Sequence, residues 1–224
     1  MDRLHKLYGR RKGKKLRQRQ DGLMTDFLPL VAVDVSGALA LDALFPFARV
    51  ETRLEIGFGD GERLVEQASQ QPDVAFLGCE PFLNGVAKAV AAISDRGLAN
   101  VRIHSGDARD LLAALPTGSL DRIELLYPDP WPKRRHHKRR IVSDDFLAAA
   151  ARVLKSGCEL RFATDIDDYC AWTLVHISRS KDFIWSASRP ADWLTAWEGW
   201  APTRYEMKAR REGRPSAYLT FVRK

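Results

Sequence analysis

The chain has 224 residues and an apolar fraction of 45%, which is enough for one domain with a hydrophobic core. No apolar stretch approaches the roughly 18 residues that would span a membrane, and the basic N-terminus lacks the apolar segment of a secretory signal. These features argue against membrane and secreted proteins, and we expect a cytoplasmic location. Cys79, Cys158 and Cys170 form no close pair, so reduced thiols are expected.

Charge is distributed unevenly along the chain. The net charge is +7, yet residues 1–19 alone carry nine Lys or Arg and one acid, and residues 133–140 carry six basic residues and no acid. The remainder is therefore acidic, with a net charge of −7. Two basic patches on an acidic body suggest a polyanionic partner that is bound at defined places. For the first patch, a solvated tail is an equally good interpretation.

Strand-like and helix-like segments alternate from residue 53 onward. Residues 1–20 are predicted to form a basic, flexible arm, and residues 21–224 a single domain. Strands are predicted at 53–56, 74–80, 101–107, 119–127, 158–165, 183–188 and 217–224, and helices at 62–69, 82–97, 144–157 and 167–178. This alternation predicts an α/β fold whose mainly parallel sheet carries helices on both faces.

A glycine-rich turn, Glu55-Ile56-Gly57-Phe58-Gly59-Asp60-Gly61, follows the first predicted strand. Its glycines allow a tight turn and close approach of the backbone to a ligand. The dinucleotide fingerprint would require glycine at position 62, where the chain has Glu62. Glu55, just before the first glycine, suits the cationic sulfonium and ammonium groups of S-adenosylmethionine better than the pyrophosphate of a dinucleotide.

Two further acids follow the next predicted strands. Glu80 ends the second strand, where a carboxylate can accept hydrogen bonds from ribose hydroxyls, and Asp107 ends the third, where it can accept one from an adenine amino group. Each acid alone is more simply a solvated loop residue or a helix cap. Because the carboxyl ends of parallel strands meet at one edge of a sheet, we expect Glu55, Glu80 and Asp107 to line one crevice.

The segment Tyr127-Pro128-Asp129-Pro130-Trp131-Pro132, after the fourth predicted strand, is the most unusual in the chain. Each proline is expected to push the preceding residue into an extended conformation, giving a stiff loop that holds Asp129. The basic run 133–140 follows directly and is expected to bind phosphates, the alternative being a rigid turn and a solvated basic face. His136 and His137 lack further ligands at suitable spacing, so no metal site is predicted.

These motifs closely resemble the bacterial tRNA (guanine-N7-)-methyltransferase family. EIGFGDG, PDPWPKRRHHKRR, ATD and TRYE occur in the order of that family from about residue 50 to the C-terminus, and the PDPWPK-basic segment is the most specific of them. The resemblance implies a Rossmann-like class I methyltransferase fold, S-adenosylmethionine as cofactor and tRNA as partner. It also implies methyl transfer to N7 of the guanosine at position 46 in the variable loop.

The resemblance implies roles for individual residues. Asp129 is expected to be the catalytic acid. The expected cofactor-binding residues are Glu55, Gly57, Gly59, Gly61, Glu80, Asp107, Ala108 and Asp129. The expected substrate-binding residues are Lys133, Asp165, Thr203, Arg204, Tyr205 and Glu206. The family often has TKFE in place of TRYE, so Arg204 and Tyr205 are conservative departures. A monomer or a homodimer is compatible with the sequence.

Other classes of protein remain open. One is a methyltransferase that acts on DNA, on protein or on another RNA base. Another is a non-catalytic RNA-binding module on the same fold, which the intact glycines and acids of the predicted cofactor site disfavour. A nicotinamide-dependent oxidoreductase is disfavoured by Glu62 and by the lack of a candidate acid for hydride transfer.

Overall fold

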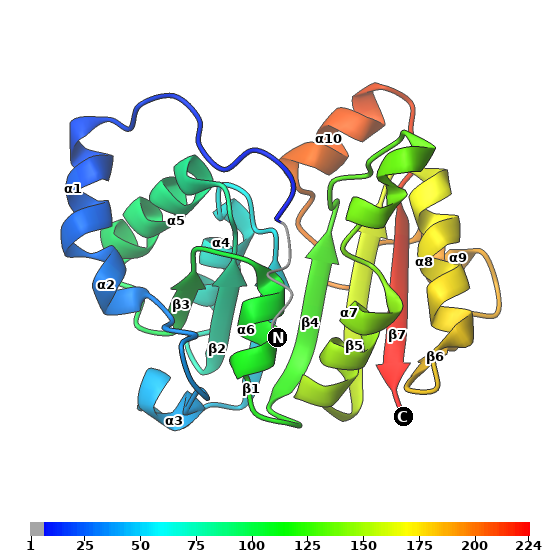
Figure 1. Cartoon of the computed structure of the whole chain (residues 1–224), viewed down its shortest axis with the longest axis horizontal. Coiled ribbons are helices and arrows are strands. Elements are labelled where there is room, and N and C mark those ends of the chain that lie inside the picture. Colours follow the sequence, from blue (N-terminus) through cyan, green and yellow to red (C-terminus); the bar gives the residue numbers. More distant parts are fainter. Residues whose placement is uncertain (1–6) are drawn as a thin grey trace.

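The computed structural model describes residues 7–224, and their strands form one seven-stranded sheet in the order β3-β2-β1-β4-β5-β7-β6 (Figure 1). Strands β1 to β5 pair in parallel, whereas β7 is antiparallel to both β5 and β6. The strands are β1 (Glu51–Ile56), β2 (Val74–Cys79), β3 (Val101–His104), β4 (Leu120–Leu126), β5 (Leu154–Thr164), β6 (Phe183–Trp185) and β7 (Ala217–Arg223). The predicted α/β fold with a mainly parallel sheet is confirmed.

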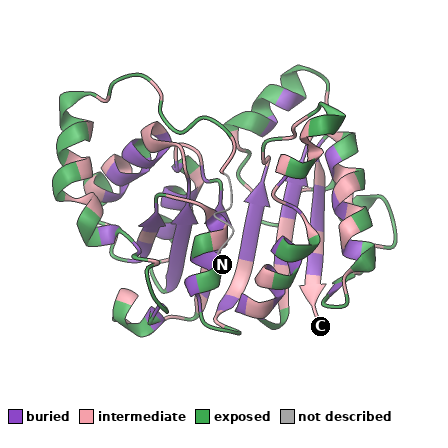
Figure 2. Ribbon diagram, viewed as in Figure 1, coloured by how far each residue is buried: buried purple, intermediate pink, exposed green. Residues whose placement is uncertain are grey.

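Helices connect most of the strands and cover the sheet. They are α1 (Gln18–Asp26), α2 (Leu28–Val31), α3 (Leu41–Leu44), α4 (Glu62–Gln70), α5 (Leu83–Arg96), α6 (Ala108–Ala114), the 3-10 helix η1 (Arg134–Arg139), α7 (Asp144–Val153), α8 (Asp167–Arg179), α9 (Ala191–Leu194) and α10 (Arg204–Arg211). Helices α6, α7 and α8 pack on the main core, and α4 and α5 on a second core over the other face of β2 and β3. The central strands are the most continuously buried part of the molecule (Figure 2).

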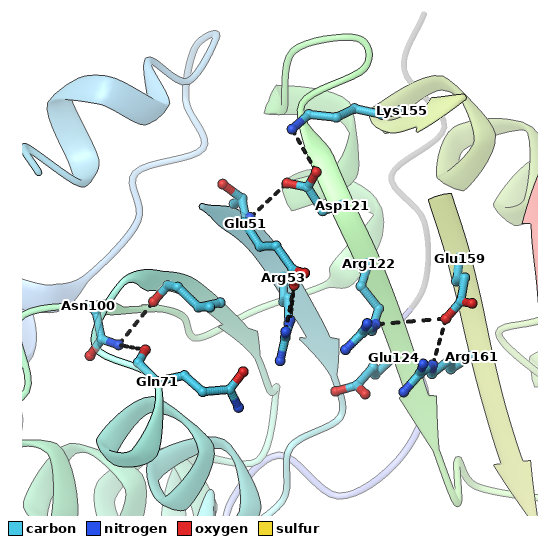
Figure 3. Close-up of polar contacts among 12 residues, drawn as sticks. Glu51, Arg53, Gln71, Asn100, Asp121, Arg122, Glu124, Lys155, Glu159 and Arg161 are labelled. Atoms are coloured by element: carbon cyan, nitrogen blue, oxygen red, sulfur yellow. Dashed lines mark hydrogen bonds and ion pairs between the residues drawn. The ribbon is translucent and has the colours of Figure 1, made fainter. Parts of the chain in front are cut away.

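Side chains alternate between the two faces along the central strands, with a register irregularity in β4 between Leu120 and Arg122. Leu54 and Ile56 of β1 lie in the main core, whereas Arg53 faces the other way and pairs with Glu51 at 2.5 Å. The same alternation on β4 and β5 directs charged side chains to the face away from that core, where Figure 3 shows Arg122 and Arg161 contacting Glu159. Ion pairs therefore offset part of the charge on this face of the sheet.

The end of one predicted helix is wrong. α7 ends at Val153, and Leu154 already belongs to β5, where it pairs with Leu120. Gly157, which we expected to end the helix, lies within β5 with a φ of +79°. The backbone N–H of Ser119 donates to the carbonyl of Val153 at 2.7 Å, so the chain is drawn into the sheet directly after the last helical turn.

The N-terminal arm is only partly as expected. Residues 1–6 lie outside the described residues, and residues 7–17 form no helix or strand. α1 begins at Gln18, inside the range 1–20 that was assigned to the arm, and its Leu23 and Met24 pack against the second core. Residues 7–17 themselves pass over the start of α5 toward the carboxyl ends of the central strands (Figure 1).

Candidate functional site

A cavity of about 940 Å³ lies at the carboxyl ends of the parallel strands. This volume is at the upper end of the range for small-molecule sites, roughly 300–1,000 Å³. Of the residues predicted for the cofactor, the cavity is lined by Gly57, Gly59, Glu80, Asp107, Ala108 and Asp129. The structure thus brings together three acids from the ends of three different strands, as the sequence predicted for Glu80 and Asp107.

The glycine turn after β1 requires glycine for two different reasons. Gly57 and Gly59 have φ angles of +77° and +61°, which other residues rarely adopt. A Cβ on Gly57 would meet nothing within 4 Å, so its open side lies next to the cavity. Gly61 does not line the cavity: a Cβ there would lie 2.5 Å from the Cβ of Ala89, so this glycine permits α4 to approach α5.

Glu80 joins the glycine turn to the start of α5. Its Oε2 accepts a hydrogen bond from the backbone N–H of Gly59 and its Oε1 one from that of Phe82, both at 2.8 Å. The side chain is 8% exposed, and burial raises its pKa despite these bonds. A carboxylate has about four lone-pair sites, so each oxygen of Glu80 retains one for a ligand hydroxyl.

Asp107 is the N-cap of α6 and accepts a hydrogen bond from the backbone N–H of Arg109 at 3.0 Å. The Arg109 guanidinium also pairs with it, with Nη2 2.5 Å from Oδ2. These contacts fix the carboxylate at the third strand end, beside Ala108 in the wall of the cavity.

Glu55 is not among the residues that line the cavity. It shares the charged face of β1 with Arg53, and its Oε2 lies 3.2 Å from Nη1 of Arg63 on α4. The same Nη1 lies 2.6 Å from Oε2 of Glu124, which is the register neighbour of Glu55 on β4. Glu55 is therefore paired with Arg63 and does not join Glu80 and Asp107 in the cavity wall, and its role in cofactor binding stays a prediction.

The loop after β4 carries two strained residues. We expected the residues before Pro128 and Pro132 to be extended, but Tyr127 and Trp131 have φ angles of +49° and +46°, so this prediction is wrong. Tertiary contacts hold Tyr127: its N–H donates to the carbonyl of Ala163 at 2.8 Å and its hydroxyl to Ser216 Oγ at 2.9 Å. Backbone strain of this kind clusters at functional sites.

Asp129 lies between the two strained residues and lines the cavity. Its carboxylate remains open to solvent, although partial burial by the surrounding walls raises its pKa. The N-terminal arm passes next to it, because a Cβ on Gly9 would lie 3.4 Å from Asp129 Oδ2. Asp129 is thus exposed in the cavity wall, next to the N-terminal arm.

The basic run does not act as one phosphate-binding surface. Lys133, Arg134 and Arg135 are exposed, but the side chain of Arg140 is fully buried. Arg140 donates from Nε to the carbonyl of Pro130 at 2.9 Å, and its guanidinium pairs with Asp168. Its guanidinium carbon also lies 4.7 and 5.2 Å from the ring centroids of Tyr169 and Trp172. The prediction of phosphate binding is therefore wrong for Arg140, which braces the Asp129 loop.

Two of the predicted substrate residues, Arg204 and Tyr205, line the cavity from α10. Arg204 pairs with Asp60 of the glycine turn and stacks on the Tyr205 ring at 5.0 Å. These contacts place the start of α10 at the cavity, beside the glycine turn.

The other predicted substrate residues lie outside the cavity, and three of the four have side-chain partners within the protein. Thr203 caps α10 by accepting a hydrogen bond from the N–H of Glu206 at 3.1 Å. Glu206 is fully buried and accepts hydrogen bonds from Trp200 Nε1 and the Tyr218 hydroxyl, both at 2.6 Å. Asp165 pairs with Arg214 at 2.7 Å, and Lys133 is exposed outside the cavity. The structure does not bring these four residues to the cavity wall.

Sequence reasoning missed one wall of the cavity. Leu7, Tyr8, Gly9 and Arg10 of the N-terminal arm line it, together with Phe82 after β2. The available signal for this wall was the glycine and the tyrosine within an otherwise basic segment, because a fully solvated tail does not require an aromatic side chain.

Neither a metal cluster nor a membrane-spanning helix is found in the part of the chain that the structure describes. Across residues 7–224 no three His, Cys, Asp or Glu side chains are grouped so that they would hold a metal ion. Within the same range, every helix is too short or too polar to cross a bilayer. Cys79, Cys158 and Cys170 are free thiols, and burial raises the pKa of each.

Comparisons with known proteins agree with this geometry. A protein-family model described as "Putative methyltransferase" matches residues 50–219. The tRNA (guanine-N(7)-)-methyltransferase of Bradyrhizobium diazoefficiens is 54% identical over 218 residues, which cover 96% of this chain and 92% of the relative. The protein of the same name from Agrobacterium fabrum is 51% identical over 219 residues, which cover 97% and 94%.

Solved structures share the fold at lower identity. TrmN from Thermus thermophilus matches 88% of this chain and 52% of its own, with a TM-score of 0.56 and 20% identity. The 16S rRNA methyltransferase KamB matches 82% of this chain and 94% of its own, with a TM-score of 0.54 and 16% identity. These likenesses confirm the predicted Rossmann-like class I methyltransferase fold.

Proposed function

This chain belongs to the tRNA (guanine-N7-)-methyltransferase family, and from that premise we propose that it methylates N7 of the guanosine at position 46 in the tRNA variable loop. S-adenosylmethionine is the methyl donor that the family and the fold imply. The observation that carries the proposal is the convergence of Glu80, Asp107 and Asp129, from the ends of three strands, on one cavity.

The cavity walls fit S-adenosylmethionine. The free lone pairs of Glu80 suit the ribose hydroxyls, and Asp107 lies at the next strand end, where it can accept a hydrogen bond from the adenine amino group. Gly57 leaves the backbone open to the cavity on the β1 side. When bound, the cofactor supplies a methyl group on a positively charged sulfur.

Asp129 is the candidate catalytic residue. Guanine N7 has a lone pair and no proton to remove, so attack on the methyl group requires no general base. Methyl transfer moves positive charge onto the guanine ring, and a carboxylate held beside that ring stabilises the charge as it develops. Asp129 can also accept hydrogen bonds from guanine N1–H and N2–H₂, which would orient N7. Alignment of this kind supplies roughly 7–11 kcal/mol in favourable cases.

The exposed part of the basic run supports an RNA substrate. Lys133, Arg134 and Arg135 lie directly after the Asp129 loop and are open to solvent. Lys acts as a point charge on a phosphate, and Arg can form two parallel hydrogen bonds with it. A base that enters the cavity therefore has cationic side chains beside it for its own backbone.

The test uses purified protein, labelled S-adenosylmethionine and an unmodified tRNA transcript. A matched transcript carries adenosine at position 46. We expect 7-methylguanosine, identified by mass, from the first transcript and none from the second. Label in another nucleoside, or equal label in both transcripts, would refute the assignment of position 46.

A further inference from the structure

The N-terminal arm is docked on α5 through its backbone. The N–H of Leu83 donates to the carbonyl of Arg11 at 2.9 Å, which satisfies a free donor at the helix start. Asn84 contacts the arm with both ends of its side-chain amide: Oδ1 accepts from the N–H of Gly13 at 2.6 Å, and Nδ2 donates to the carbonyl of Lys14 at 2.7 Å. These hydrogen bonds use only backbone groups of the arm, and the basic side chains of residues 10–17 remain exposed.

The fit at Gly13 is close. A Cβ on this residue would lie 2.7 Å from Asn84 Oδ1 and 3.1 Å from the Phe82 ring. Only glycine therefore permits the arm to lie against the start of α5 in this way. The Asn84 amide and Gly13 fix the position of the arm along α5. They therefore also fix the position of the arm residues that precede Gly13.

The docked arm brings Tyr8 over the Asp129 loop. The Tyr8 and Trp131 rings lie edge to face, with centroids 6.3 Å apart at 72°. The guanidinium carbon of Arg139 lies 4.9 Å from both ring centroids. Tyr8 and Gly9 line the same cavity as Asp129, and this cavity retains about 940 Å³, so the arm borders the space and does not fill it.

We propose that Tyr8 forms the wall on which the target guanine stacks, and that Asn84 is the positioning residue that holds the arm so that this wall exists. The inference rests on the proposed function, because it concerns the base that receives the methyl group. Enzymes that act on a base take it out of its stack and hold it between aromatic side chains. Arg139 keeps the Tyr8 ring beside Asp129, where guanine N7 has to be presented.

The first test replaces Tyr8 in the full-length protein and measures kcat/KM for tRNA and the affinity for S-adenosylmethionine by calorimetry. Loss of one base–aromatic stack should lower kcat/KM of Tyr8→Ala by about 5- to 150-fold and leave cofactor affinity within about twofold. Tyr8→Phe is the matched control, since it keeps the ring, and should lower kcat/KM for tRNA less than Tyr8→Ala does. An unchanged Tyr8→Ala, an equal loss in Tyr8→Phe, or an equal loss of cofactor affinity would each overturn the assignment.

The second test asks whether Asn84 acts through the arm. Asn84→Ala should lower kcat/KM for tRNA without changing the thermal midpoint, and adding Asn84→Ala to Tyr8→Ala should cause no further loss. Additive losses would overturn the positioning role. A gain in turnover by Asn84→Ala would mean that the docked arm obstructs the base, which also overturns the proposal.

A third measurement does not depend on turnover. A tRNA with 2-aminopurine at the target position should fluoresce less when bound to the wild-type protein than when bound to Tyr8→Ala, because stacking on the Tyr8 ring quenches this base. Equal quenching by both would contradict stacking on Tyr8. The assay of the wild-type protein separates the two proposals. If the wild-type protein transfers no methyl group to tRNA, the proposed function fails. If Tyr8→Ala transfers methyl groups as well as the wild type does, only the stacking role of Tyr8 is refuted.

Discussion

Replacing Glu55 with glutamine tests how the buried charges beside the glycine turn are balanced. Glu55 and Glu124 are neighbours in the β1–β4 register and are 6% and 3% exposed. Arg63 is the cation between them, and it forms two hydrogen bonds with Glu124, at 2.6 and 2.9 Å, but only one with Glu55. Burial therefore raises the pKa of Glu55 to about 7, whereas Arg63 outweighs burial at Glu124 and lowers the pKa of that carboxyl group.

The expected effect on stability follows from the pKa of Glu55. Its rise from 4.5 to about 7 corresponds to about 3 kcal/mol. Because folding raises this pKa, the folded protein holds the proton more tightly than the unfolded chain, so this group's contribution declines as the pH rises from about 4.5 through about 7. Glutamine keeps an oxygen for Arg63 and has no proton to lose. We therefore expect Glu55→Gln to gain up to about 3 kcal/mol over the wild type between pH 5 and pH 8.

Denaturant unfolding at pH 5 and pH 8 measures this difference. In a protein of this size, each kcal/mol raises the melting temperature by roughly 2–4 °C, so a thermal scan at pH 8 provides a second measure. The control is Glu62→Gln, which removes an exposed carboxylate from the same helix as Arg63 and should show no such pH dependence. An equal change in the free energy of unfolding at both pH values would refute the explanation that Glu55 and Glu124 share Arg63 as their cation. Calorimetry of Glu55→Gln with S-adenosylmethionine tests the predicted cofactor role separately.

Three variants with changes near the Asp129 loop give distinct expected outcomes. Asp129→Asn should lower kcat by about 10²–10³-fold in a methyl-release assay, and because burial raises the pKa of Asp129, the acid limb of the wild-type pH profile should lie above the ordinary value of 3.8. Arg140→Lys loses the Nε bond to Pro130 and should lower kcat more than it raises KM for tRNA. Lys133→Ala combined with Arg135→Ala should reduce the slope of log K against log salt by about 1.4–1.8 in a binding titration; an unchanged slope would exclude phosphate contacts.

The order of the elements was predictable because hydrophobic period and turn residues agree along most of the chain. α5 shows this well: its amphipathic pattern predicted a helix that ends at Gly97, and Gly97 is the left-handed C-cap. The end of α7 was not predictable, because Leu154 fits a helix by propensity. Its pairing with Leu120, which depends on a distant strand, decides its conformation.

The acids of the site show which side-chain positions can be predicted from the local sequence pattern and which cannot. Glu80 and Asp107 follow strand ends, so their place at the edge of the sheet follows from chain direction alone. Glu55 lies within a strand, where its face depends on the parity of the pleat, and it shares the face of Arg53 and not that of Ile56. A carboxylate next to a glycine turn is therefore not necessarily directed into the cavity beside that turn.

The basic run shows why a dense cluster of charge cannot be interpreted from composition. In a 3-10 helix, residues three apart lie on the same side, so η1 presents its side chains in rows. His136 and Arg139 contact Trp131, with centroid distances of 6.0 and 4.9 Å. Arg134, His137 and Arg140 form the next row, in which His137 and Arg140 contact Asp168 and Arg134, at the start of the helix, is exposed.

Arg135 and Lys138 form the remaining row, which is exposed. Removal of charge from this row should weaken binding to RNA phosphates and leave the Asp129 loop in place. Removal of the charge of Arg139 or Arg140 should instead act through Trp131 or Asp168 and change the loop itself. The helix period together with burial, and not the number of cations, thus separates the exposed basic residues from those that hold the Asp129 loop.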